Sequence, residues 1–348
     1  MQTLYNIHQL KSLKKQTNLK YSLDVLRFVT NEDMQNYNMT ASEDGFFLLG
    51  LEATTMMQNL TFASFSAAYI LTVFGNFTII FIIRAECRLH TPMYFFLANL
   101  ALIEIIYPSS VIPNTLHMLV KEDKRISFAG CFIQMFIFIT LGGSECILLG
   151  IMAYDRYVAI CNPLLYTTIM GRLFCLHLVL ICWAVGFLNS LLHTVLAGLL
   201  PFCADRHIKH FFCEIPCILK LSCKNTSLNE MLIFFLGGSI TVGSLTLILV
   251  SYACIVVSVV RIRSLTGKHK TFSTCISHLI VVSVFFGTVI SIYIRPTSQT
   301  SDDENRIISV VYGVFTPLFN PIIYSFRNQE FQRALLRVLQ AQTALCSP

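Results

Sequence analysis

Residues 60–83 read LTFASFSAAYILTVFGNFTIIFII, a run that contains no Asp, Glu, Lys or Arg. The hydrocarbon core of a bilayer is about 30 Å thick, and an α-helix needs roughly 20 apolar residues to cross it. This run is therefore long enough to span a membrane. A buried helix of a soluble protein can mimic one such run, so the rest of the chain decides between the two.

Six further runs of the same kind follow. They cover residues 92–120, 129–154, 173–200, 231–260, 271–294 and 307–326. Their only acids are Glu104 and Glu145, and none of them contains Lys or Arg. With 55% hydrophobic and 13% charged residues and a mean hydropathy of +0.65, the chain has too little polar surface for a soluble fold. The sequence predicts an all-α membrane protein, a seven-transmembrane helix bundle with a short amphipathic C-terminal helix.

Charge sets the expected orientation. Residues 40–59 contain three acids and no Lys or Arg, whereas Arg84 and Arg88 follow the first span, so the positive-inside rule places the N-terminus outside the cell. The sequon at Asn38 supports this, because glycosylation requires a lumenal tail. The expected parts of this multi-pass plasma membrane protein are an extracellular tail (1–58), a transmembrane domain (59–327) and a cytoplasmic tail (328–348).

The net charge of +6 does not indicate nucleic-acid binding. The Lys and Arg residues are scattered between apolar runs and do not gather on one segment, so we interpret them as loop anchors.

Five of the thirteen cysteines lie on the predicted outer side, where disulfides form. The loop of residues 201–223 carries four of them and is long for a connection between helices, so it needs a tether or a function. We favour the pairs Cys131–Cys213 and Cys203–Cys223, with Cys217 left over, although spacing alone allows other partners. No Cys or His spacing fits a zinc site.

Two acids stand near the middle of membrane spans, where an ionisable group costs several kcal/mol unless it is paired or solvated. Facing inward, Glu104 and Glu145 can share a polar cavity with Asn76 and Asn320. Two carboxyls this close suit a cation such as sodium, or they share a proton. The alternative is a purely structural hydrogen-bond cluster.

Two motifs lie at predicted helix ends. Asp155-Arg156-Tyr157 ends the third span, where the Arg can be held by its neighbour in one state and released in another, or can serve only as an anchor. Residues 317–324, PLFNPIIY, predict a hinge in the seventh span, because two prolines remove backbone donors and Asn320 can bond the freed carbonyls or a polar neighbour. The alternative is that the prolines serve helix packing only. We interpret His193 and His278 as packed and hydrogen-bonded rather than as ligand groups.

Taken together, six motifs occur in a specific order. They are Gly75-Asn76, LHTPMYFFL (89–97), MAYDRYVAIC (152–161), Ser251-Tyr252, KTFSTC (270–275) and NPIIY (320–324). This set resembles the signature of the odorant receptors, within the rhodopsin-like class A G-protein-coupled receptors, and its spacing is similar to the tetrapod-type branch. The resemblance extends over residues 46–340, and the outer cysteine set also fits it.

The resemblance implies that Arg156 engages a stimulatory, olfactory-type G protein, which raises cyclic AMP. It also implies that Tyr252 and Tyr324 reorganise around Arg156 when the sixth helix swings outward. The residues expected in this switch are Asp155, Arg156, Tyr157, Tyr252, Asn320, Pro321 and Tyr324. The ion pocket implied for sodium is formed by Asn76, Glu104, Glu145 and Asn320.

By the same resemblance, an odorant binds between the third, fifth and sixth helices, beneath the long outer loop. The expected lining is Phe138, Ile139, Gly142, Gly143, Phe286, Gly287, Ile290 and Tyr293. These residues are mostly apolar, so a small volatile with at most one or two polar groups suits them.

The chain departs from the family pattern in three places. Glu104 stands where Asp is commoner, Phe285-Phe286-Gly287 replaces the usual Phe-Tyr-Gly, and residues 1–33 have no counterpart in the usual short tail, so we interpret them as an atypical extension.

Other functions lack their sequence features. An opsin needs a Lys in the seventh span, and residues 307–326 contain none. An amine receptor needs an acid near Phe138. A transporter is expected to show repeated halves, and an enzyme a catalytic set; neither is evident, so we expect no enzyme. The closest rival is a peptide or lipid receptor of the same fold, against which only the motif set argues.

Overall fold

The computed structural model describes residues 45–50, 55–121, 124–202, 206–261, 265–293, 302–327 and 329–345. The predictions for residues 1–44, including the atypical extension and the sequon at Asn38, lie outside these ranges. From Gly45 onward the chain forms one compact unit, and the description that follows concerns that unit.

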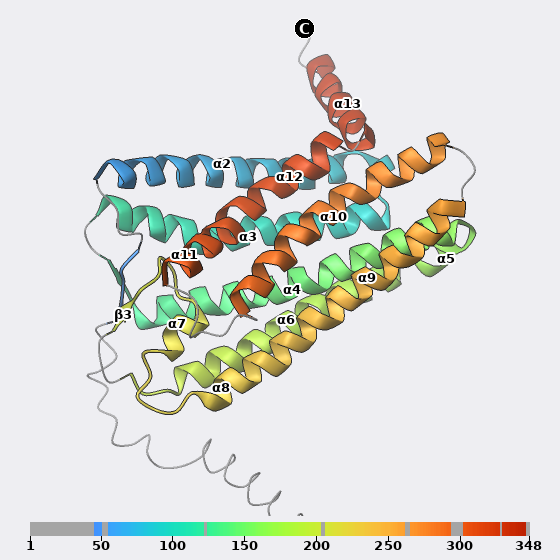
Figure 1. Cartoon of the computed structure of the whole chain (residues 1–348). Coiled ribbons are helices and arrows are strands. Elements are labelled where there is room, and N and C mark those ends of the chain that lie inside the picture. The colour runs from blue at the N-terminus through green and yellow to red at the C-terminus, as the bar shows by residue number, and fades with distance from the viewer. Residues whose placement is uncertain are drawn as a thin grey trace, which may run out of the picture. The chain divides into compact units, whose positions relative to one another are not determined.

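Seven long helical segments form a bundle and carry the seven predicted spans (Figure 1). Their bounds are α2 (Thr55–Ala85), α3 (Pro92–Val120), α4 (Phe128–Cys161), α6 (Arg172–Gly198), the run α8 (Ser227–Leu232), η5 (Ile233–Gly237) and α9 (Gly238–Arg261), α10 (Leu265–Tyr293), and the run α11 (Asp302–Val310), η6 (Val311–Phe315) and α12 (Thr316–Arg327). Among the described residues, six segments are long and apolar enough to cross a membrane, and α10 carries the shorter apolar stretch Cys275–Ser291.

Short elements connect these helices. They are the strands β1 (Phe46–Leu48), β2 (Arg125–Ile126) and β3 (His207–Ile208), and the helices η3 (Cys87–Leu89), η4 (Pro163–Leu165), α5 (Tyr166–Ile169) and α7 (Ile215–Leu219). After the bundle comes α13 (Gln329–Leu345). It buries Phe331 and Ala334 while Gln332 and Arg333 are exposed, so the prediction of an amphipathic C-terminal helix is confirmed.

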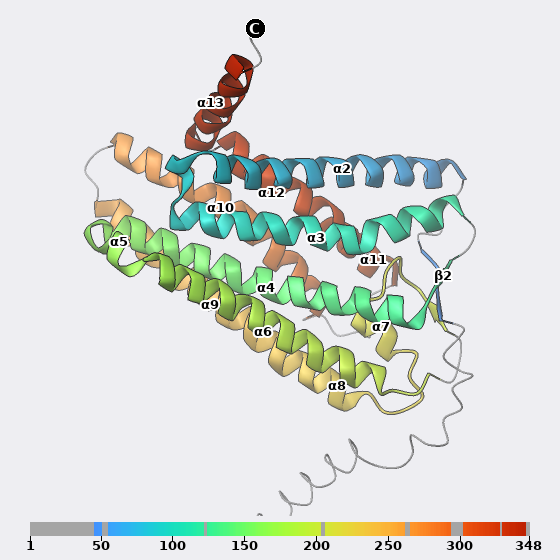
Figure 2. The same ribbon diagram turned by 180° about the vertical axis from the view of Figure 1, so that it is seen from behind.

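The three strands lie together at one end of the bundle, opposite the end that carries α5 (Figures 1 and 2). We call these ends the sheet end and the tail end. In the sheet, β1 pairs antiparallel with β2 and parallel with β3, with Phe46 opposite Ile126 and Phe47 opposite His207. Gly45 has a φ of +51°, and a Cβ there would collide with the carbonyl oxygen of Ile126, so only glycine fits. The strand that precedes the first span is thereby tied to two loops of the bundle.

The helices α4 and α6 pack closely against each other. A Cβ on Gly186 of α6 would overlap Ser144 and the backbone of Thr140, so glycine lets the two backbones approach. The Ser190 hydroxyl donates to the Phe136 carbonyl at 2.6 Å, which satisfies a polar group inside the bundle. Small residues therefore set the distance between these helices.

The outward faces of the helices are apolar. On α2, for example, Leu71, Phe74 and Phe77 are all more than half exposed, and α6 and α9 show the same feature with exposed Leu, Ile and Val. Surfaces of this kind need lipid around them. The chain is thus a multi-pass membrane protein with a bundle of seven helices.

Candidate functional site

The two membrane acids meet in the middle of the bundle. Asn320 on α12 donates a hydrogen bond to Glu104 on α3, and a side-chain hydrogen bond joins Glu104 to Glu145 on α4. All three side chains are buried, and Glu104 is only 1% exposed. We call these three residues the acid cluster; it links three helices that are far apart in sequence.

Asn76, the fourth residue predicted for this site, has a different role. Its amide donates to the Pro317 carbonyl of α12 at 3.4 Å and to the Thr72 carbonyl at 3.0 Å. Pro321 has no N–H with which to bond the Pro317 carbonyl, so that carbonyl is free to accept from another group. Of the two partners expected for the Asn320 amide, a freed carbonyl or a polar neighbour, the structure shows the second, because this amide donates to Glu104.

The neighbouring Gly75 completes this contact. A Cβ at Gly75 would lie 3.0 Å from the Cβ of Pro321, closer than carbon atoms normally pack. The Gly75-Asn76 pair of α2 therefore holds α12 in two ways. The glycine leaves room for the proline ring, and the asparagine donates to the Pro317 carbonyl that Pro321 cannot bond.

One oxygen of the acid cluster has no hydrogen-bond partner among the described residues. This is Oε1 of Glu145, which is fully enclosed by protein. A buried carboxylate oxygen without a donor is costly. The position therefore suits a cation or an ordered water molecule.

At the tail end, Asp155 and Arg156 have separate contacts. The Tyr166 hydroxyl of α5 donates to Asp155 at 2.8 Å, and the Arg156 guanidinium lies against the Met93 sulfur of α3. Tyr157 is half-buried beside them. Arg156 is thus placed at the base of the bundle next to the start of α3.

The tyrosine predicted to join Arg156 is held by α10. The Tyr252 hydroxyl and Nδ1 of His278 are 2.9 Å apart, and the two rings are stacked with centroids 5.8 Å apart. Arg156 is close enough to interact electrostatically with both groups. The prediction of a packed and hydrogen-bonded His278 is confirmed. Its role as the partner of Tyr252 was not foreseen, although a lone histidine in a charge-free span was the available signal.

Pro321 and Asn320 lie on α12, as predicted, and Tyr324 lies on the same helix one turn later. The side chain of Tyr324 is outside the described residues, so the predicted contact of Tyr324 with Arg156 stays a prediction.

The predicted odorant residues divide into three groups. Phe138 is buried in an aromatic cluster, with its ring centroid 4.8 Å from that of Tyr107, 4.7 Å from Phe212 and 5.4 Å from Tyr312. None of the last three was predicted. Phe212 comes from the long loop between α6 and α8, so this loop reaches the interior of the bundle.

Other residues of the predicted odorant site lie beside space that side chains do not fill. A Cβ on Gly142 would meet no atom within 4 Å. Ile139 and Ile290 are half-buried, and Phe286 is buried with its ring 5.3 Å from that of Phe285. We keep these four residues as the candidate lining, whereas the side chain of Tyr293 lies outside the described residues.

Two predicted lining residues face elsewhere. A Cβ on Gly143 would point at the backbone of Gly186, 3.5 Å away, so Gly143 lies in the contact between α4 and α6. Gly287 is exposed and, at 100° per residue, lies on the side of α10 opposite buried Phe285. Both predictions were wrong for the same reason, because apolar helices give little sequence signal for which face turns inward.

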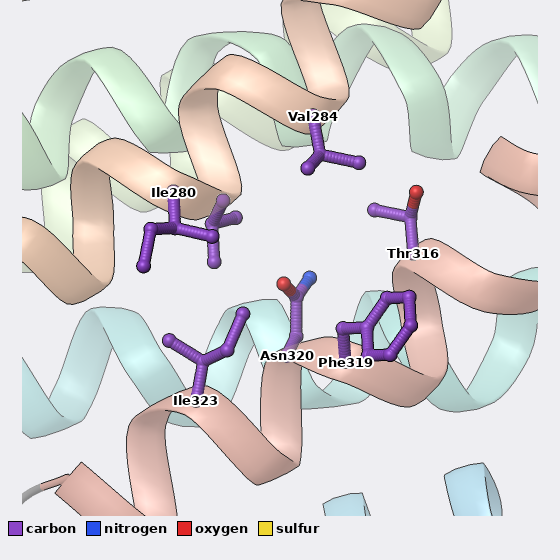
Figure 3. Close-up of a pocket in the computed structure, with 7 residues that line it drawn as sticks. Ile280, Val284, Thr316, Phe319, Asn320 and Ile323 are labelled. Atoms are coloured by element: carbon purple, nitrogen blue, oxygen red, sulfur yellow. The ribbon is translucent and has the colours of Figure 1, made fainter.

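A cavity of about 270 Å³ lies between α10 and α12 (Figure 3). It is lined by Ile280, Val281, Val284, Thr316, Phe319, Asn320 and Ile323. No predicted odorant residue lines it, and it shares only Asn320 with the acid cluster. The cavity therefore borders the acid cluster rather than the candidate lining around Gly142.

The long loop is tethered as predicted. The Cys131–Cys213 disulfide is present, with Cα atoms 5.4 Å apart. Cys223 is also disulfide-bonded, and its backbone N–H donates to the Pro201 carbonyl at 3.1 Å. Its predicted partner, Cys203, lies outside the described residues. The Cys131 bridge pins the loop to the sheet end of α4.

Side chains next to the bridge fix the loop further. The Cys213 N–H donates to Gln134 at 2.8 Å, and the Gln134 amide donates to the Ser110 carbonyl of α3, also at 2.8 Å. Phe211, beside Phe212, is fully buried with its ring centroid 6.3 Å from that of Phe65. The loop is therefore a packed cover over the sheet end.

This cover contains a buried histidine and acid. Nε2 of His210 is 3.6 Å from Oε2 of Glu214, and both side chains are almost completely buried. Burial raises the pKa of the Glu214 carboxyl to about 7, and the charge of Lys220 offsets part of that rise. The carboxyl thus titrates near neutral pH.

This pKa predicts how the stability of the cover depends on pH. From about pH 5 to about pH 7, Glu214 is protonated in the folded loop but ionised in the unfolded chain, so stability falls as the pH rises through this window. We expect the melting temperature of the purified protein to fall across this range, and Glu214→Gln to flatten the dependence. Glu230→Gln, at an exposed glutamate of α8, is the control and should keep it. A wild-type profile identical to that of Glu214→Gln contradicts the assignment.

Comparisons with known proteins agree with this architecture. Residues 65–342 match the olfactory receptor family model. The chain is 45% identical to "Olfactory receptor 2A7" of Mus musculus, over 88% of this chain and 99% of that protein, and 45% identical to "Olfactory receptor 2B2" of Homo sapiens, over 84% and 82%. The crystal structure of squid rhodopsin superposes with a TM-score of 0.66 at 17% identity, covering 86% of this chain and 89% of that one. The chain therefore belongs to the olfactory receptor family, whose members are G-protein-coupled receptors for odorants and not enzymes.

Proposed function

We propose that this receptor binds a small volatile molecule within the bundle and activates a stimulatory, olfactory-type G protein, raising cyclic AMP. The main support for this ligand site is the open space beside Gly142 on α4. The long loop between α6 and α8 covers the bundle above it and is joined to α4 by the Cys131–Cys213 disulfide. The candidate lining of Ile139, Gly142, Phe286 and Ile290 is apolar, which favours a ligand with few polar groups.

The sheet end is proposed to face the outside of the cell, with the receptor in the plasma membrane. The disulfide of Cys131 and Cys213 lies at this end, and disulfides persist in oxidising compartments. The chain enters the first span from the same end, through β1. This supports an extracellular N-terminus, and with it a cytoplasmic position for Arg156.

The contacts of Tyr252 indicate how the signal would pass. An outward movement of α10 would carry His278 away from α9 and break its hydrogen bond with Tyr252. Tyr252 would then be free to approach Arg156, whose guanidinium lies against the thioether of Met93. A hydrogen bond of this kind contributes about 1 kcal/mol, so ligand binding can shift the balance between the two arrangements.

The acid cluster is proposed to bind sodium. Two carboxyls and an amide supply the oxygen ligands that hard cations prefer, and Oε1 of Glu145 is buried without a donor. A bound cation would hold α3, α4 and α12 together and offset the cost of burying charge.

The sodium proposal predicts a salt-specific effect on stability. The melting temperature of the purified receptor should be higher in sodium chloride than in choline chloride at equal ionic strength, and Glu145→Gln should remove the difference. Equal melting temperatures of the wild type in the two salts would exclude a sodium site.

Coupling is tested with Arg156→Ala. In cells that express the olfactory-type G protein, a broad panel of volatiles should raise cyclic AMP through the wild-type receptor, and this variant should abolish the response while reaching the cell surface normally. Arg84→Ala is the matched control, because Arg84 is an exposed arginine at the same end of the bundle. Normal signalling by Arg156→Ala would remove Arg156 from the coupling site.

The ligand site is tested with Gly142→Leu. The added side chain fills space beside α4, so the response should shift toward smaller agonists by about tenfold or more in potency ratio. Gly243→Leu on the exposed face of α9 adds the same volume where it meets only open space, and should leave the agonist ranking unchanged. The same ranking in both variants would place the ligand elsewhere.

A further inference from the structure

Two polar side chains of α6 lie inside the bundle, and each has an atom without a hydrogen-bond partner among the described residues. Nε2 of His193 and Oδ1 of Asn189 are enclosed by protein, and neither has a hydrogen-bond partner among the described residues. The His193 side chain is only 3% exposed. The two residues are four apart on one helix, so their Cβ atoms are about 5–6 Å apart on the same face.

Neighbouring residues show which way this face turns. Gly186 and Ser190 face α4, and the Trp183 indole bonds Asn99 of α3. At 100° per residue, Asn189 and His193 are rotated from the α4 direction away from Trp183. They therefore lie on the flank of α6 that turns away from α3, with His193 still at the edge of the face that packs against α4.

The surroundings of this side of α6 are otherwise apolar. At the sheet end of the bundle, Met135 and Ala197 belong to one buried cluster, with Ile139 and Ile233 packed against it. Ile139 also belongs to the candidate ligand lining, one helical turn from Gly142. The helix η5, which also contacts α6, is π-helical, a local departure from regular geometry that often accompanies functional sites.

Leaving such atoms unbonded is costly, since a buried polar group without a partner loses its full hydration. The amide oxygen of Asn189 can only accept a hydrogen bond, whereas a ring nitrogen of His193 can donate one. A hydroxyl group meets both requirements, because it donates one hydrogen bond and accepts another. An ether oxygen of the same shape can only accept, and a hydrocarbon does neither.

We propose that Asn189 and His193 bind the hydroxyl group of an alcohol or phenol whose apolar body extends along Ile139 toward Gly142. The hydroxyl donates to Oδ1 of Asn189 and accepts from Nε2 of His193. This assignment of a ligand class rests on the proposed function, the binding of a small volatile inside the bundle.

The experiment compares linear and aromatic alcohols with their methyl ethers on the full-length receptor. Cyclic AMP responses and the melting temperature of the purified protein are both measured. Alcohols should be more potent than the matching ethers by about tenfold, the equivalent of one hydrogen bond, and only they should raise the melting temperature. Asn189→Leu and His193→Phe should each remove this preference.

Thr194→Val is the matched control. Thr194 has an equally buried hydroxyl without a described partner, but it lies on the side of α6 that turns toward α3. Its replacement should leave the preference for alcohols intact. Should His193→Phe fail to reach the surface, Asn189→Leu and the melting temperatures of the wild type still decide the question.

The remaining outcomes separate the two proposals. Aldehydes, ketones, esters and acids are run in the same screen. If these activate the receptor while alcohols and ethers are equal or inactive, the hydroxyl site is wrong and the odorant function stands; the two side chains then bind ordered water only. If no volatile of any class acts, the proposed function fails together with the hydroxyl site.

Discussion

The hydrogen bonds from Asn320 to Glu104 and from Glu104 to Glu145 are the constraint on which the bundle depends. In the middle of a membrane no bulk water competes for these groups, so each must find its partner on another helix. One cluster thereby positions α3, α4 and α12 relative to one another. The helix α12 is also held by α2, where Gly75 packs against Pro321 and Asn76 bonds the Pro317 carbonyl.

This arrangement connects the two ends of the molecule. Toward the sheet end, α4 carries Phe138, the space at Gly142 and the disulfide to the covering loop. Toward the tail end, the same helix carries Arg156 beside the pair of Tyr252 and His278. A ligand that displaces α10 or α12 at one end therefore acts on buried polar contacts that can break and reform, since the packed core itself deforms little.

Charge and length alone predicted much of the fold. The seven spans were expected, because long runs without charge leave few alternatives. The Cys131–Cys213 bridge was the favoured pairing among several that the spacing allowed. The contact between Glu104 and Glu145 was predictable, because burying either carboxyl in a membrane without a partner costs free energy.

Helix rotation was not predictable in the same way. Lipid and protein interior are both apolar, so Gly143 and Gly287 look the same in sequence whether they face a cavity, a neighbouring helix or the membrane. The partners of long-range contacts, such as Asn76 with Pro317 and Tyr252 with His278, also depend on that rotation. The π-helical turns η5 and η6 were also not predicted, because no sequence pattern marks them.

The most direct test of the acid cluster is a double-mutant cycle between α3 and α12. The free energy of unfolding would be measured for the wild type, Glu104→Ala, Asn320→Ala and the double variant. If the hydrogen bond joins the helices, the two effects should be non-additive, with a coupling energy of about 0.5–3 kcal/mol. Additive effects would show that the two side chains stabilise the bundle independently, and would contradict the account.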